Sequence, residues 1–137
     1  MADGSTLPIL LRQLRLPTMA ACYEDIVEQA NTYGWPLDRS LATLCEYELA
    51  ERDRRRLQRH LKEARLPGGK TIETFDFGAI GGADRPQLTQ LATDTGWIER
   101  CQNLLLFGPS GVGKSHIAAA IGHALIEQGL RVRYFSA

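Results

Sequence analysis

One stretch of the chain has residue types and spacing suited to binding phosphate. Residues 108–115 read GPSGVGKS and match the phosphate-loop pattern G-x-x-x-x-G-K-[ST]. The three glycines let the backbone turn tightly with its N–H groups pointing inward, which forms a nest for an anion. The lysine can reach the β- and γ-phosphates of a nucleoside triphosphate, and the final serine can bind Mg²⁺. The predicted nucleotide phosphate site comprises Gly108, Pro109, Ser110, Gly111, Val112, Gly113, Lys114 and Ser115, with Ser115 as the Mg²⁺ ligand.

The segments on either side of this loop predict the two elements that a phosphate loop requires. Leu104 to Phe107 is a short apolar run typical of a strand buried on both faces. The residues after the loop have apolar positions at helical spacing, and Gly129 stands where that helix would end. A second strand is predicted at residues 130–135. A glycine-rich turn with a chance lysine is the alternative, and the matching flanks argue against it.

The predicted fold class is therefore α/β, with two parts. A small all-helical module is expected over residues 1–66, with helices at 5–15 and 17–34 and a longer helix or a helix pair at 37–65. Pro67, Gly68 and Gly69 mark a joint. Residues 67–137 are expected to begin a P-loop nucleotide-binding domain that is incomplete at its C-terminus.

Basic residues gather at the end of the last helix of the predicted module. Residues 52–70 contain eight basic and two acidic side chains, out of 16 Lys and Arg in the whole chain. Arg52, Arg55, Arg56 and Arg59 are three or four positions apart and share one helix face. Such a face can neutralise DNA phosphates without reading sequence. An ordinary solvated helix is the alternative, and both interpretations stay open.

Three further side chains have two interpretations each. Phe75 and Phe77 lead into the P-loop domain, where aromatic rings can pack against adenine; equally, they can fill the joint between the two parts. His116 follows the phosphate loop directly. It either faces the nucleotide or packs within the fold.

Composition limits the class of protein. The 16 basic and 16 acidic residues balance, so net charge names no partner. Cys22, Cys45 and Cys101 have no spacing typical of a metal site and are expected to be reduced thiols. No apolar stretch is long enough to predict a signal peptide or a membrane span. A cytoplasmic protein that makes no contact with a membrane is expected.

The residues that carry these motifs also resemble a known family. NLLLFGPSGVGKSHIAAAIGHALIEQGLRVRYFSA, preceded by ARLPGGKTIETFDF and an arginine-rich helical segment, resembles the IstB-like family. These AAA+ ATP-binding proteins help bacterial insertion sequences to transpose and are similar to DnaC-type helicase loaders. The resemblance implies ATP with Mg²⁺ as the nucleotide, assembly on DNA as a homo-oligomer, and a partner transposase. It also implies that the helical module contacts DNA or that partner.

Hydrolysis of ATP requires residues that this sequence does not supply. The family's ATPases need a Walker B acid at the end of a later strand, and the only acid after Ser115 is Glu127, on the helix that leads away from the phosphates. Two strands are also too few for a covered parallel sheet. The chain is therefore interpreted as the N-terminal part of a longer protein, and no catalytic residue is assigned.

Other functions remain open at this point. A helicase loader of the same fold would act in DNA replication. A nucleotide- or DNA-binding remnant would have no enzymatic role. A small-molecule P-loop kinase is a further alternative, which the arginine-rich helical module argues against.

Overall fold

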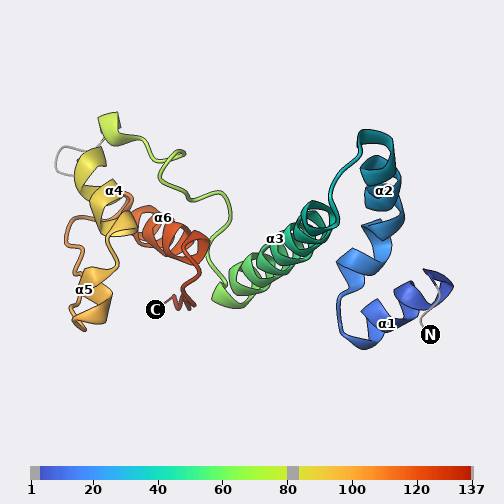
Figure 1. The fold of residues 1–137 in the computed structure, drawn as a ribbon. Coiled ribbons are helices and arrows are strands. Elements are labelled where there is room, and N and C mark those ends of the chain that lie inside the picture. The colour runs from blue at the N-terminus through green and yellow to red at the C-terminus, as the bar shows by residue number, and fades with distance from the viewer. Residues whose placement is uncertain (1–3, 80–83, 137) are drawn as a thin grey trace. The chain divides into compact units, whose positions relative to one another are not determined.

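The computed structural model describes residues 4–79 and 84–136, and all regular structure in these ranges is helical (Figure 1). The elements are η1 (Gly4–Thr6), α1 (Leu7–Gln13), α2 (Pro17–Tyr33), α3 (Leu37–Ala64), η2 (Phe77–Ala79), α4 (Arg85–Thr93), α5 (Gly96–Glu99) and α6 (Lys114–Glu127). The chain forms two compact units, Met1–Arg56 and Leu57–Ala137, here called unit 1 and unit 2. The division falls within α3, which contributes residues to both.

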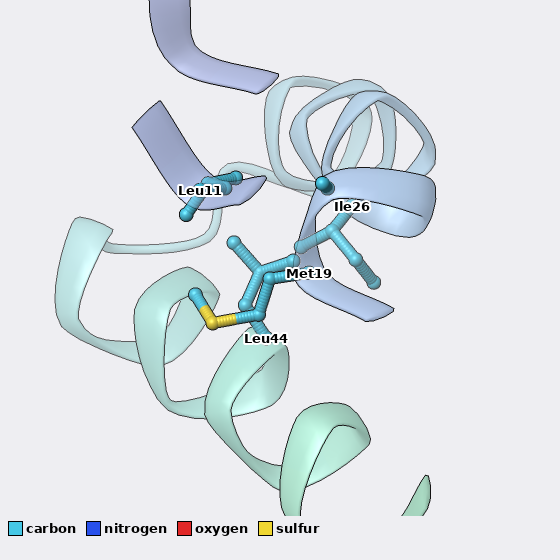
Figure 2. Packing of buried hydrophobic residues seen from close by; sticks show 5 residues of the cluster. Leu11, Met19, Ile26 and Leu44 are labelled. Atoms are coloured by element: carbon cyan, nitrogen blue, oxygen red, sulfur yellow. The ribbon is translucent and has the colours of Figure 1, made fainter. Parts of the chain in front are cut away.

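Unit 1 is a small helical cluster built around apolar side chains from α1, α2 and α3. Leu11, Met19, Ile26 and Leu44 are buried together, as Figure 2 shows. Proline at the first position of α2 has the backbone angle that a helix start needs, and Gly34 ends this helix in a left-handed conformation with φ 63°. Local sequence signals thus set the ends of α2, while burial of its apolar face holds it in place.

A buried carboxylate from α3 caps the start of α2. Glu48 Oε2 accepts hydrogen bonds from the backbone N–H groups of Thr18, at 2.8 Å, and Met19, at 3.0 Å. Arg52 donates to Glu48 Oε1 at 3.2 Å and to the Arg15 carbonyl oxygen at 2.7 Å. Burial would raise the pKa of Glu48, but the backbone N–H donors and the Arg52 guanidinium outweigh it and lower that pKa. Glu48 and Arg52 therefore join α3 to the corner between α1 and α2.

Unit 2 is organised around α6. Ile117, Ile121 and Leu125 on α6 pack in one cluster with Leu88 of α4 and with Phe75. On α6, Gly122 lies so close to Leu66 and Val132 that a Cβ at this position would approach them to 3.2 and 3.3 Å. The Gln128 side chain donates to the Ala92 carbonyl oxygen at the end of α4. These contacts surround the helix that follows the phosphate loop.

The predicted α/β sheet is wrong for the described part of the chain. Residues 102–109 and 130–136 have no regular secondary structure, and Figure 1 shows no strand in either segment. A strand requires a partner for its backbone groups. Instead of pairing with a strand, the Tyr134 N–H donates at 2.8 Å to the carbonyl oxygen of Ala64, the last residue of α3. Leu105 and Phe107 are 70% and 87% exposed, so residues 104–107 are not buried on both faces as predicted. Leu106, Leu130 and Val132 are partly buried against the core of unit 2.

Three further predictions concern the joint between the two parts, the cysteines and membrane-spanning helices. The predicted joint at residues 67–70 lies inside unit 2, and the division into residues 1–66 and 67–137 stays a prediction. The three cysteines are free thiols. Within the described ranges, no helix combines the length and the apolar character needed to cross a bilayer.

Candidate nucleotide-binding site

The phosphate loop is held in shape by glycines with left-handed backbone angles. Gly111 has φ 83°, and Gly113, which directly precedes α6, has φ 90°. Side chains with a Cβ rarely adopt these angles, which explains glycine at both positions. The Gly113 carbonyl oxygen accepts from the Ile117 N–H at 2.9 Å and so starts the hydrogen-bond ladder of α6. The loop therefore ends directly at the N-terminus of α6, where the helix dipole favours binding of an anion.

Lys114 folds back across the loop that precedes it. Its ammonium donates to the Gly108 carbonyl oxygen at 2.7 Å and to the Pro109 carbonyl oxygen at 2.6 Å. An ammonium has three N–H donors, so one remains for a ligand. The positive charge is thereby fixed beside the loop by two contacts from the loop itself.

A cavity of about 800 Å³ opens beside this loop, and all its lining residues belong to unit 2. Its volume is in the range usual for ligand pockets. Its walls come from the loop, the apolar segment 104–107, α4 and residues 74–76. The predicted phosphate-site residues that line it are Gly108, Pro109, Gly111, Val112, Gly113 and Lys114. Ser110 and Ser115 are exposed and are absent from the described lining.

The two predicted adenine contacts occupy different positions. Phe75 lines the cavity, but it is only 6% exposed and belongs to the core of unit 2. Phe77 packs with its ring edge-on to Phe75, at 4.8 Å between ring centroids, and is absent from the described lining. The Arg85 guanidinium lies over the Phe77 ring at 5.0 Å. Only Phe75 is therefore placed beside the phosphate loop.

Sequence reasoning missed several polar residues of the cavity. Thr74, Asp76 and Asp84 line it, and so does His116, whose role the sequence left open. The T-x-x-T spacing of Thr71 and Thr74 is the one signal that could have indicated a hydroxyl-stabilised turn. The two aspartates follow no pattern that would have singled them out.

The four predicted DNA-contacting arginines also differ in their surroundings. In unit 1, Arg55 pairs with Glu51 at 3.0 Å and Arg56 with Asp53 at 3.0 Å, while Arg52 is held by Glu48. Arg59 belongs to unit 2, where it lines a second cavity of about 500 Å³. It forms no ion pair within the described residues.

Acidic side chains therefore neutralise part of the positive charge on the basic half of α3. Glu48 and Glu51 lie just before the basic segment in sequence and reach forward to its arginines. Hydrogen bonding and charge from Arg54, followed by Arg55, lower the pKa of Glu51 to about 2. The arginine side chains at 55 and 56 remain 53% and 55% exposed, so they are still accessible to an anion.

No group of three potential metal-binding side chains is formed by histidines, cysteines, aspartates and glutamates in the described ranges. Mg²⁺ held with a nucleotide needs no such group, because it keeps several waters and takes substrate phosphates with one or two protein ligands. Ser115, the predicted Mg²⁺ ligand, follows the lysine that lines the cavity, but its own side chain is exposed and is absent from the described lining.

Comparison with known proteins gives consistent matches. The family model for IstB-like ATP binding proteins matches residues 9–137. A Sinorhizobium fredii protein named for an insertion sequence and for ATP binding is 49% identical over 132 residues, which cover 96% of this chain and 44% of that protein. A Geobacillus stearothermophilus protein named for IS5376 and for ATP binding is 36% identical, with 91% of this chain and 49% of that protein covered. A Pseudomonas aeruginosa protein named for IS21 and for ATP binding is also 36% identical, with 93% and 48% covered. The chain spans about half the length of these relatives.

Proposed function

Because the chain belongs to the family of IstB-like ATP binding proteins, we propose that unit 2 binds ATP in the cavity beside the phosphate loop. The observation that carries this proposal is the position of Lys114. Its ammonium is fixed beside the loop by the Gly108 and Pro109 carbonyl oxygens and keeps one N–H donor for a phosphate. A helix N-terminus and a cavity of suitable size adjoin it.

Two regions of the cavity are proposed to bind two parts of ATP, the phosphates and the base. The loop N–H groups and Lys114 would hold the β- and γ-phosphates, and the Ser115 hydroxyl would hold Mg²⁺, which would supply positive charge to those phosphates. The base lies toward the apolar wall that contains Phe75, as one of the two sequence interpretations held. Phe77 supports that wall through its edge contact with Phe75.

The wider role is proposed from the relatives. Several are named as ATP-binding proteins of insertion sequences, which favours DNA transposition over helicase loading in replication. We therefore assign the protein to the ATP-dependent assistance of a transposase, with DNA and further copies of itself as partners. The exposed arginines of α3 supply the DNA contacts: Arg55 and Arg56, together with the remaining donors of Arg52, in unit 1, and Arg59 in unit 2.

The test of ATP binding compares two lysine variants. Lys114→Ala removes a charge-assisted contact and is expected to cost about 1.5–3 kcal/mol of binding free energy, a roughly tenfold to 150-fold rise in Kd. Lys62→Ala is the matched control, because Lys62 also belongs to unit 2 but does not line this cavity. Isothermal titration calorimetry with ATP and Mg²⁺ measures both. Equal affinity in the parent and Lys114→Ala would contradict the proposed site.

A further inference from the structure

A turn formed by residues 69–75 makes one wall of the cavity, and the Thr74 hydroxyl closes this turn on itself. Thr74 Oγ1 donates to the Gly69 carbonyl oxygen at 2.7 Å and accepts from the Thr71 N–H at 2.9 Å. The Phe75 N–H donates to the Ile72 carbonyl oxygen at 3.4 Å. Thr74 and Phe75 both line the cavity. The wall is therefore a locally ordered turn.

His116 fastens this turn to α6. Its Nε2 lies 3.0 Å from the Thr71 carbonyl oxygen and 3.2 Å from Thr74 Oγ1. A carbonyl oxygen only accepts, so Nε2 must carry a hydrogen. The Thr74 hydroxyl has two carbonyl acceptors in the turn, those of Gly69 and Thr71, the latter at 3.1 Å, so its hydrogen can stay within the turn while its oxygen lies within hydrogen-bond distance of Nε2. The Phe75 ring meets the His116 ring edge-on at 5.1 Å. Three residues of the turn thus hold one imidazole.

Because His116 lies on α6, its contacts link the 69–75 turn to the helix that follows the phosphate loop. His116 lies in the first turn of α6, two residues after Lys114, which is fixed against the loop. The position of the wall relative to the loop therefore depends on the imidazole, together with the packing of Phe75 against Ile117 and Ile121 of α6. That position decides whether a nucleoside fits beside phosphates that Lys114 holds.

We infer that His116 is a positioning residue, which holds the 69–75 turn at the spacing that admits the nucleoside part of a triphosphate. It does so through Thr71, Thr74 and Phe75, and it does not itself bind the phosphates. This inference rests on the proposed ATP site and assigns a function to a side chain for which the sequence left two interpretations.

The test uses two variants and two ligands. His116→Gln keeps an N–H donor at about the reach of Nε2, whereas the shorter His116→Asn places its donor near the position of Nδ1. Calorimetry with ATP and with inorganic tripolyphosphate, both with Mg²⁺, distinguishes the contribution of the nucleoside to affinity from that of the phosphates. For His116→Asn we expect ATP to bind about threefold to tenfold more weakly, the effect of removing one hydrogen bond, with tripolyphosphate affinity unchanged. His116→Gln should bind both ligands as the parent does.

A loss of affinity that is equal for the two ligands, or no loss in His116→Asn, would overturn the inference. Amide hydrogen exchange of residues 71–75 without nucleotide provides a separate measure. Exchange should be several times faster in His116→Asn and parental in His116→Gln, and equal exchange in all three proteins would also overturn it. If the parent binds neither ligand, the proposed ATP site fails, while the exchange rates still decide whether His116 holds the turn.

Discussion

Glu48 is a single side chain whose charge and burial both matter to the fold of unit 1. Its carboxylate accepts two backbone N–H groups at the start of α2 and pairs with Arg52. No residue of the sequence just before α2 caps that helix through its side chain. Removing the charge therefore leaves backbone donors of a buried helix end with a weaker acceptor.

Glu48→Gln is expected to lower the free energy of unfolding by about 2 kcal/mol at neutral pH, the size of a charge-assisted hydrogen-bond contribution. The folded-state pKa of Glu48 lies below its ordinary value of 4.5. Its stabilising contribution is thus complete above pH 4.5 and is lost as pH falls through the lowered pKa. Urea unfolding from pH 7 to pH 3 should show the gap between parent and variant closing at acid pH. Glu46→Gln, an exposed change on the same helix, is the control, and a gap that widens at low pH would contradict this role of Glu48.

Gly111 and Gly68 form a matched pair that isolates backbone conformation. Neither glycine has an atom within 4 Å of an added Cβ, but only Gly111 has a left-handed φ, of 83°. Gly111→Ala should therefore lower the free energy of unfolding by about 1–2 kcal/mol more than Gly68→Ala does. Thermal unfolding followed by circular dichroism compares the two variants. If both were equally stable, the loop would not need glycine for its conformation.

At the residue scale, the sequence predicts local chemistry better than long-range partners. The phosphate loop is predicted from its pattern alone, because eight neighbouring residues carry the whole signal. Glu48 was missed because its backbone partners lie 29 and 30 residues away. Thr74 and His116 are 42 residues apart, and no spacing rule joins them.

Among the elements, α3 combines a role in the core with a basic surface. Its first half packs in unit 1 through Leu44 and Glu48, and its second half carries the arginines. Helical spacing brings Glu51 and Asp53 against Arg55 and Arg56. Exposed pairs of this kind are weak, so a DNA phosphate can compete for these arginines.

The double variant Arg55→Ala/Arg56→Ala should bind duplex DNA of any sequence more weakly. The dependence of log K on log salt should flatten by up to about 0.9 for each phosphate that the variant no longer neutralises. The same two positions changed to lysine keep the charge and should largely retain binding. Fluorescence anisotropy across a salt series measures both variants. An unchanged slope in the alanine variant would mean that these two arginines do not contact DNA phosphates.

Helices were predictable and strands were not, for a physical reason. The helical segments carry a local period, and proline or glycine marks the ends of α2. The apolar runs at residues 104–107 and 130–135 predicted strands from composition, but a strand exists only through a partner. Neither run pairs with a strand in the described residues. Residues 104–107 are mostly exposed, and Leu130 and Val132 are only partly buried.

On the scale of the whole chain, the two units carry separate proposed roles. Unit 2 holds the phosphate loop, its cavity and the Thr71–His116 contacts, whereas unit 1 holds most of the basic residues of α3 that are proposed to contact DNA. The ATP proposal accordingly requires nothing from unit 1. The chain covers 44–49% of the three relatives described above, and the activity of a whole family member is part of the proposal.

The most direct measurement of the central claim is a pair of ¹H–¹⁵N spectra of the chain, with and without ATP and Mg²⁺. We expect the largest shifts on the backbone N–H groups of residues 108–115, with smaller shifts at Thr74 and Phe75 and little change in α1 and α2. No shift at saturating ATP, or shifts centred on residues of unit 1, would contradict ATP binding at the phosphate loop.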